Sequence, residues 1–437
     1  MKYKILKRMI LLLVVASHSN QLYSQSTAKP LATVVAGIPV NYDESKVGTY
    51  TLPDPLTLLN GQKVTNADTW MKMRRPEIVK IFEENQFGKA PGRPKDMSFD
   101  LFDKGTPAFG GTAIRKQVTV YFTKDTSNYK MDILIYLPAN APKPSPLLLT
   151  ISFSANANAV NDPGVKKSMI WTKTGQRVPV PAIGFGKLNT EQFLSQGIGV
   201  ANICYSDIDP DFKEGIKYGI RSHYLKPGQT QPADDEWGAI AAWAWGLSRA
   251  MDYFETDKDI NAKKIAITGA SRLGKTVLWA GANDQRFAAV IASVSGESGA
   301  ALSRRWYGET VKHMTDSTRF MYQFARKYHS YGDDVSKLPM DGHMLISLIA
   351  PRPLLLQTGD TDNWSDPKGE FLAAVAAEPV YHLFGKKGLE TTTMPLANDT
   401  TMLNTLGYFM HSGPHGVLPG DYGVFVSFLK KHLLSDK

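Results

Sequence analysis

Gly269-Ala270-Ser271-Arg272-Leu273-Gly274-Lys275 is the stretch that decides the fold of this 437-residue chain. It directly follows Lys264–Thr268, an apolar run rich in β-branched residues, and it leads into 276–280, which is typical of a helix. The pattern predicts a strand, a sharp turn and a helix, with Ser271 at the turn. A serine held there stands clear of the sheet, where a base can accept its proton and backbone N–H groups can hold an oxyanion. The stretch therefore predicts a nucleophile elbow, although the following glycine, Gly274, lies one residue later than in the usual motif.

Apolar runs of strand length alternate with helical segments along most of the chain. Before this part, two alternating runs, Gln117–Thr123 and Met131–Pro138, predict antiparallel strands. Continuous apolar strands that alternate with helices are typical of a parallel sheet with both faces covered. We therefore predict an α/β-hydrolase fold, with a mostly parallel central sheet in a three-layer sandwich and inserted loops at 155–190 and 302–340 around the active site. The expected parallel strands are Pro146–Ser152, Ile198–Cys204, Lys264–Thr268, Ala288–Ser293 and Pro353–Thr358. The expected helices are Trp70–Asn85, Asp235–Phe254, Lys275–Ala282, Gly342–Ala350, Pro367–Ala377 and Tyr422–Leu433.

The N-terminal segment has the pattern of a secretory signal peptide. Basic residues between Lys2 and Arg8 precede an apolar run, Met9–Ala16, which is too short to span a bilayer. Small residues follow, and they predict a cut after Ser24 and export to the periplasm or the extracellular space. We expect an N-terminal extension over residues 25–65 and a single catalytic domain over 66–437.

Composition excludes several classes of function. The formal net charge of +9 falls to +5 once the four basic residues of the first 24 positions are set aside, and no dense basic run remains. We therefore expect no binding to nucleic acid and no membrane span. The single cysteine, Cys204, excludes an internal disulfide and is expected to be buried at a strand end. We expect a monomer.

An acid and a base are needed to activate Ser271, and this fold supplies them in the order serine, acid, histidine. The strand at 353–358 is followed by Asp360 and Asp362, and we prefer Asp360 as the acid because it is closer to the strand end. His411 and His415 lie just before the last helix, and we prefer His415 because glycines on both sides let the backbone bend around its ring.

Two histidines four residues apart can also indicate a zinc site on a helix. Pro414 and Gly416 interrupt any helix between His411 and His415, and no third ligand stands out. We therefore expect no metal and no cofactor.

Further motifs accompany the elbow and extend over roughly residues 70–437. Together they resemble the glucuronoyl esterase family of carbohydrate esterases, in its bacterial branch. The motifs are Asp207-Ile208-Asp209-Pro210-Asp211, Ser271-Arg272-Leu273-Gly274-Lys275, Gly299-Ala300-Ala301-Leu302-Ser303-Arg304-Arg305, Ala350-Pro351-Arg352-Pro353, Trp364-Ser365-Asp366-Pro367, Gly369-Glu370-Phe371 and His415-Gly416.

The resemblance implies a hydrolase of esters of the glucuronic acid carboxyl group. In plant cell walls these esters join 4-O-methyl-glucuronoyl units of xylan to lignin alcohols, so glucuronoxylan or lignin–carbohydrate esters are the implied substrate. The roles that it implies are nucleophile for Ser271, base for His415, oxyanion binding for Arg272, sugar-hydroxyl binding for Lys275 and Glu309, and lining of the uronate site for Trp364.

Some of these roles have plain structural alternatives. Glu309 could form an ion pair with Arg304 or Arg305 instead of binding sugar, and Trp364 could pack in the core.

The chain departs from the family at one catalytic position. Many members carry a catalytic Glu after the strand that follows the nucleophile helix, and the matching residue here is Val294, which cannot polarise a histidine. Either Asp360 is the only acid, which we prefer, or the nearby Glu297 substitutes for the missing group.

Two other functions remain open at the level of sequence. The same fold supports an acetyl xylan esterase or another carbohydrate esterase, and the loss at Val294 also fits a non-catalytic carbohydrate-binding relative.

Overall fold

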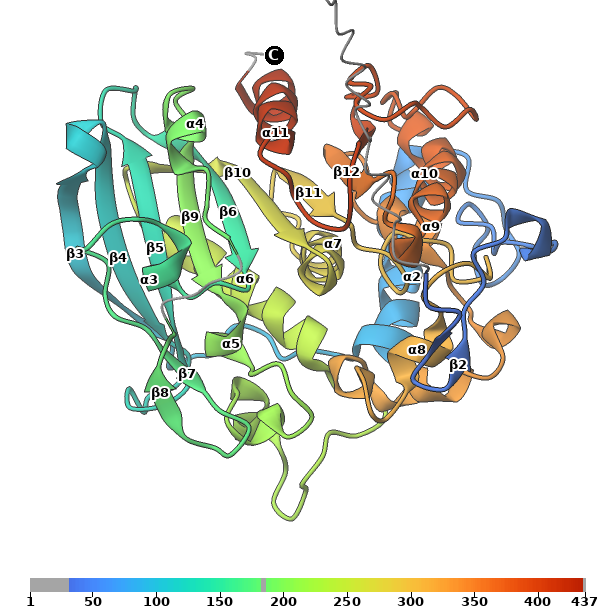
Figure 1. Cartoon of the computed structure of the whole chain (residues 1–437), viewed down its shortest axis with the longest axis horizontal. Coiled ribbons are helices and arrows are strands. Elements are labelled where there is room, and N and C mark those ends of the chain that lie inside the picture. The colour runs from blue at the N-terminus through green and yellow to red at the C-terminus, as the bar shows by residue number, and fades with distance from the viewer. Residues whose placement is uncertain (1–30, 182–185, 435–437) are drawn as a thin grey trace, which may run out of the picture.

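A large twisted sheet forms the centre of the molecule. The computed structural model describes residues 31–181 and 186–434, and within them nine strands form one sheet in the order β13-β12-β11-β10-β6-β9-β5-β4-β3. The antiparallel strands β3, β4 and β5 lie at one end, and β12 lies towards the other, near α10 (Figure 1). The strands are β3 Ser98–Ala108, β4 Ala113–Tyr121, β5 Lys130–Pro138, β6 Ser145–Ser152, β9 Gly199–Cys204, β10 Ile260–Ala270, β11 Ala289–Ser293, β12 Leu354–Gly359 and β13 Leu406–His411.

The direction of the strands confirms the predicted fold class. Strands β9, β6, β10, β11, β12 and β13 pair in parallel, and β5, β4 and β3 pair antiparallel. Because the parallel strands all end at one edge, the loops after β10, β12 and β13 meet there. The sequence prediction missed β3 and β13, and it gave the other seven strands within a few residues.

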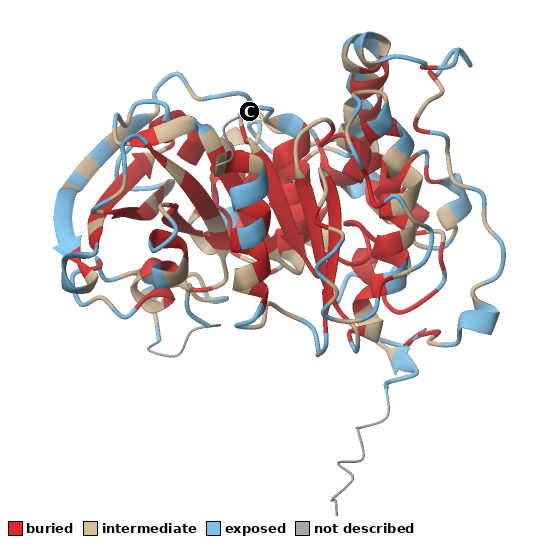
Figure 2. Ribbon diagram, turned by 90° about the horizontal axis from the view of Figure 1, so that it is seen from above, coloured by how far each residue is buried: buried red, intermediate tan, exposed pale blue. Residues whose placement is uncertain are grey.

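Helices cover the two faces of the sheet. One apolar core contains buried residues of α6, α7, α9 and α10, and a second contains residues of α4 and α11. The strands are buried in the middle of the molecule, whereas the edge strand β3 is largely exposed (Figure 2). The α-helices are α1 Ala67–Thr69, α2 Arg75–Phe82, α3 Asn156–Ala159, α4 Thr190–Leu194, α5 Tyr205–Ile208, α6 Ala239–Phe254, α7 Arg272–Asn283, α8 Val311–Thr315, α9 Gly342–Ser347, α10 Pro367–His382 and α11 Asp421–Leu429.

The insertions and the N-terminal extension lie around this core. The 155–190 insertion carries a two-stranded sheet, β7 Met169–Trp171 and β8 Arg177–Pro179, and the extension carries another, β1 Val34–Val35 and β2 Ile38–Pro39. Asn41 donates a hydrogen bond to the carbonyl of Trp306, so the extension is fixed to the 302–340 insertion. The expected signal peptide lies outside the described residues, and no helix in the described part is long and apolar enough to cross a membrane.

Candidate active site

Ser271 lies on a strained turn between β10 and α7. Its φ and ψ angles are 59° and −127°, a conformation that costs a non-glycine residue about 1–3 kcal/mol. The turn closes tightly on both sides, since a Cβ added at Gly269 would lie 2.5 Å from the carbonyl oxygen of Leu273, and one at Gly274 would lie 2.7 Å from that of Ser293. The two glycines therefore permit the elbow, and the displaced Gly274 has a steric role of its own.

His415 lies in the loop between β13 and α11 and forms a short hydrogen bond to a carboxylate. Its Nδ1 atom is 2.6 Å from Oδ2 of Asp362, whose side chain is only 4% exposed, whereas the imidazole is 42% exposed. The hydroxyl of Ser365 lies 3.1 Å from the same Nδ1 atom. Ser271 and His415 line the same cavity. Asp362 is thus positioned to hold the ring in the tautomer that leaves Nε2 free to accept a proton.

The prediction of Asp360 as the partner of His415 is corrected by this geometry. The chain turns sharply after β12, and Oδ1 of Asp360 accepts a hydrogen bond from the N–H of Gly413 at 2.8 Å. The Asp360 side chain therefore binds the backbone of the histidine loop, while the Asp362 side chain faces the imidazole of His415.

The alternative acid, Glu297, is also occupied elsewhere. It accepts hydrogen bonds from the N–H of Ser298 at 2.7 Å and from the hydroxyl of Ser303 at 2.6 Å. Burial raises the pKa of Glu297 to about 8, so its charged form is disfavoured. Its contacts hold the loop between residues 297 and 303 together and leave Asp362 as the carboxylate at His415.

His411, the alternative base, has a structural environment. Its Nδ1 atom lies 2.8 Å from a carboxylate oxygen of Asp421, its Nε2 atom lies 2.9 Å from the carbonyl of Pro414, and the side chain is 3% exposed. His411 and His415 contact different carboxylates, Asp421 and Asp362. His411 instead ties the end of β13 to the start of α11.

Arg272 is held beside Ser271 by a carboxylate from a distant loop. Its guanidinium pairs with Asp211, which also accepts hydrogen bonds from the hydroxyl of Tyr322 at 2.6 Å and from the amide of Gln323 at 2.9 Å. The guanidinium packs 4.8 Å from the ring centre of Phe320. Because Arg272 is the first residue of α7, its backbone N–H also lacks a partner within the helix.

Lys275, one helical turn beyond Ser271, and Glu309 are two buried ionisable groups that attract each other. Both side chains are buried, and Glu309 accepts a hydrogen bond from Arg319 at 2.9 Å. Burial lowers the pKa of Lys275 and raises that of Glu309, and the attraction between the two groups opposes both shifts. Arg319, and not Arg304 or Arg305, is therefore the ion-pair partner of Glu309.

Trp364 follows β12 and contacts Arg319, the ion-pair partner of Glu309. Arg319 lies over its ring at 5.3 Å, and the imidazole of His313 meets it edge-on at 5.1 Å. Its side chain is half-buried, and the Trp364 carbonyl accepts a hydrogen bond from the N–H of Glu309 at 2.8 Å. The indole is thus fixed in orientation with part of its surface exposed.

Sequence reasoning missed the residues that orient this site. Asp211 was part of a quoted motif without a role, and Tyr322, Gln323 and Arg319 lie in the 302–340 insertion, where no local pattern singles them out. Cys204 is buried at the end of β9 as expected, and burial raises the pKa of its thiol to about 12.

Comparison with known proteins gives consistent matches over most of the chain. A family model described as "Glucuronyl esterase, fungi" matches residues 161–385. The carbohydrate esterase MZ0003, from an unknown prokaryotic organism, is 44% identical over 402 residues, which cover 90% of this chain and 92% of that protein.

A solved structure and a fungal enzyme extend these matches. The glucuronoyl esterase from Solibacter usitatus superposes with a TM-score of 0.84 at 44% identity, covering 89% of this chain and 100% of that one. A 4-O-methyl-glucuronoyl methylesterase from Podospora anserina is 27% identical over 356 residues, covering 78% of this chain and 63% of that protein. With the elbow, the histidine loop and the α/β-hydrolase sheet in place, these matches show that the chain belongs to the glucuronoyl esterase family of carboxylic ester hydrolases.

Proposed function

We propose that this protein hydrolyses esters of the glucuronic acid carboxyl group, as in the 4-O-methyl-glucuronoyl units of xylan that are esterified to lignin alcohols. The observation that carries the proposal is the pair of cations on the first turn of α7. Arg272 and Lys275 lie one and four residues after the nucleophile, and each faces a carboxylate that fixes or balances its charge. A glucuronate ester suits this arrangement, because Arg272 can stabilise its carbonyl oxygen, and Lys275 and Glu309 can bind the neighbouring sugar hydroxyls.

The chemistry is a two-step acyl transfer. His415 accepts the proton of the Ser271 hydroxyl while the serine oxygen bonds to the ester carbonyl carbon. The carbonyl oxygen becomes an anion, which the N–H and the guanidinium of Arg272 stabilise. The imidazolium then gives its proton to the alcohol oxygen, the ester C–O bond breaks and the alcohol leaves. Water then attacks the acyl-enzyme carbonyl while His415 accepts its proton. His415 returns the proton to the Ser271 oxygen as the bond between that oxygen and the carbonyl carbon breaks, which releases the uronic acid.

The sugar is expected to bind between Lys275, Glu309 and Trp364. Within the described residues, Nζ of Lys275 has no recorded hydrogen bond or ion pair although the side chain is buried, so it has three donors to offer. A carboxylate accepts from vicinal hydroxyls, and an indole covers the apolar face of a pyranose. These groups bind ground state and transition state alike, whereas Arg272 acts when the oxyanion forms.

A substrate pair tests the proposal. We expect the purified protein to hydrolyse methyl 4-O-methyl-glucuronate far faster than an acetylated xylo-oligosaccharide, as measured by acid release and by acetate release. Acetate release alone would make the protein an acetyl xylan esterase. Binding of glucuronoxylan without turnover of either ester would make it a non-catalytic relative and overturn the proposal.

Asp211 is expected to act on catalysis through Arg272. The Asp211→Asn variant should lower kcat by about tenfold to a hundredfold with a smaller change in KM, because the guanidinium loses the group that aims it at the oxyanion. The effect should vanish when Arg272 is already alanine, which a double-mutant cycle on kcat measures. Equal losses in both backgrounds would mean that Asp211 supports only the fold, and Asp316→Asn, on an exposed turn, serves as the control.

We also propose that residues 1–24 direct export, since an insoluble wall polymer can be reached only outside the cell. N-terminal sequencing of the protein recovered from the native host should begin at Gln25. A mature protein that still starts at Met1 would refute this.

A further inference from the structure

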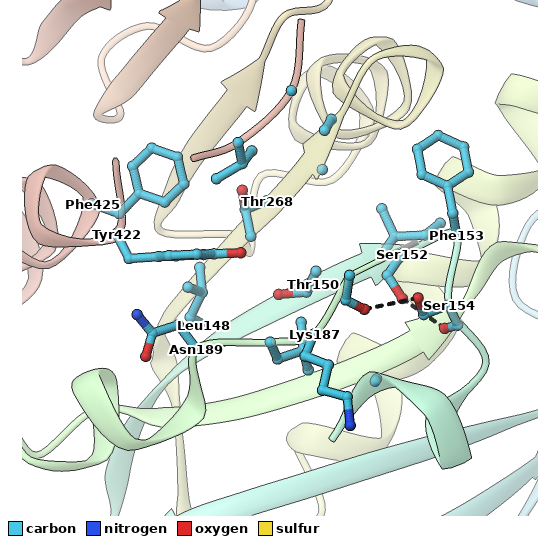
Figure 3. Close-up of a pocket in the computed structure, with 18 of the residues that line it drawn as sticks. Leu148, Thr150, Ser152, Phe153, Ser154, Lys187, Asn189, Thr268, Tyr422 and Phe425 are labelled. Atoms are coloured by element: carbon cyan, nitrogen blue, oxygen red, sulfur yellow. Dashed lines mark hydrogen bonds between the residues drawn. The ribbon is translucent and has the colours of Figure 1, made fainter. Parts of the chain in front are cut away.

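Tyr42 lies in the N-terminal extension and has no role in the mechanism above. Its side chain is half-buried, and no hydrogen bond of its hydroxyl is recorded among the described residues. The cavity that contains Ser271 and His415 lies between β6, β10 and α11 (Figure 3), and none of its recorded lining residues belongs to the extension. Tyr42 therefore lies outside this cavity, and its neighbours are the segments that carry Glu309 and Trp364.

Asn41 fixes the backbone beside Tyr42 to the turn that precedes Glu309. Its side-chain amide donates a hydrogen bond to the carbonyl of Trp306 at 2.7 Å, and its carbonyl accepts one from the N–H of Gly308 at 2.8 Å. Asn41 is buried, so water does not compete for these bonds. The residue next to Tyr42 is thus attached directly to this turn.

Glu44 provides a second anchor on the other side of Tyr42. Its carboxylate forms ion pairs with Arg305, which is buried, and with Lys368 at 2.8 Å. Because Asn41 and Glu44 hold the chain on both sides, the position of Tyr42 relative to the turn is fixed.

The turn itself is packed against the segment that follows β12. A Cβ added at Gly308 would lie 2.5 Å from the carbonyl oxygen of Trp364, so only glycine fits there, and its φ of 61° also favours glycine. The next residue, Glu309, donates its backbone N–H to the same carbonyl at 2.8 Å. The anchors of the extension therefore lie directly beside two residues of the proposed uronate site.

An aromatic contact and two negative charges place the Tyr42 side chain. Its ring meets the ring of Tyr307 edge-on at 5.9 Å, and the Tyr307 hydroxyl donates a hydrogen bond to Asn363 at 2.9 Å. Burial and the negative charges of Asp362 and Glu309 raise the pKa of Tyr42. The phenol is therefore near both the carboxylate that holds His415 and the carboxylate expected to bind sugar, and it remains a neutral donor at neutral pH.

We propose that Tyr42 donates a hydrogen bond to a hydroxyl of the bound uronate, so that the N-terminal extension forms part of the substrate site. The inference rests on the proposed function. Lys275 offers donors to the sugar, Glu309 offers acceptors, and Trp364 covers one face of the ring. A pyranose held by these groups has further hydroxyls that lose water on binding, and each needs a partner. The Tyr42 hydroxyl is available for this purpose.

Tyr42→Phe tests the proposal, because it keeps the ring and its contact with Tyr307 and removes only the oxygen. We expect KM for methyl 4-O-methyl-glucuronate to rise about threefold to tenfold, the effect of one neutral hydrogen bond, with kcat nearly unchanged. Tyr50→Phe is the matched control. Tyr50 is another half-buried tyrosine of the extension, its charged neighbours are Arg305 and Asp366, and its loss should leave both constants unchanged.

A ligand pair separates binding by the hydroxyl from support of the fold. Glucuronic acid, the product, should inhibit Tyr42→Phe about threefold to tenfold more weakly than it inhibits the wild type. Tetrahydropyran-2-carboxylic acid has the same ring and carboxyl group without hydroxyls, so it should inhibit both proteins equally. The two inhibition constants thus report on the hydroxyl even if the variant is slightly less stable.

Two results would overturn the inference while leaving the esterase intact. One is a Tyr42→Phe protein with unchanged KM and unchanged inhibition by glucuronic acid. The other is an equal weakening of inhibition by both acids, which would mean that the tyrosine only supports the shape of the site. A wild-type protein that does not cleave the glucuronate ester would instead overturn the proposed function.

Discussion

Ser271→Ala is expected to lower kcat for a glucuronate ester by about 10⁴-fold or more, the largest effect of any single substitution in this chain. The oxygen that forms the acyl-enzyme is lost, and only the oxyanion donors and the bound sugar remain to assist attack by water. The turn itself should survive, since alanine meets the same strain as serine at a φ of 59°. Initial rates with the methyl ester measure the loss of kcat, and a thermal unfolding curve shows whether the fold is retained.

A matched control and a covalent probe sharpen this prediction. Ser427→Ala removes an exposed hydroxyl of α11 that donates a hydrogen bond to the carbonyl of Gly423, and it should retain full activity. A fluorophosphonate should add its mass to the peptide that contains Ser271 in the wild type and not in the variant. A Ser271→Ala protein that keeps kcat within tenfold of the wild type would refute the mechanism.

Most of the sheet could be predicted from sequence because its parallel strands are continuous apolar runs between helices. Strand β3 could not, because residues 98–108 include charged residues, a glycine and a proline and are largely exposed at the sheet edge. Strand β13 contains Gly407, and it follows a long stretch without helix or strand after α10. Its parallel pairing with β12, which determines its place, is not a local property of the sequence.

The turn at Ser271 and the loop that carries His415 could also be predicted, because a strand–turn–helix pattern and the order of motifs along the chain can be read from the sequence. The choice between Asp360 and Asp362 could not, since proximity to the strand end says nothing about the direction of a side chain after a turn. The pairing of Arg272 with Asp211 could not be predicted either, because the two residues are 61 positions apart in the sequence. Contacts between loops decide these roles, and such contacts follow from the whole fold.

Asp362→Asn is expected to lower kcat by about 10³-fold to 10⁴-fold with little change in stability. An amide can occupy the same space, but it cannot balance the charge of the imidazolium, and its NH₂ group favours the wrong tautomer of His415. The 2.6 Å contact and the burial of the carboxylate make the loss large, because water cannot replace the missing charge. Rates with the methyl ester across the pH range measure the effect.

The competing carboxylates provide the controls for this assignment. Asp360→Asn alters a group that accepts from the Gly413 N–H, so kcat should fall by no more than about tenfold. Glu297→Ala should lower the unfolding temperature, because the loop between residues 297 and 303 loses the carboxyl oxygen that accepts hydrogen bonds from Ser298 and Ser303, while the folded fraction remains active. A collapse of activity in Asp360→Asn with Asp362→Asn nearly unchanged would show that the loop rearranges when substrate binds. A collapse of activity in Glu297→Ala with unchanged folding would instead mean that Glu297, three residues after Val294, takes over the role of the family's usual acid.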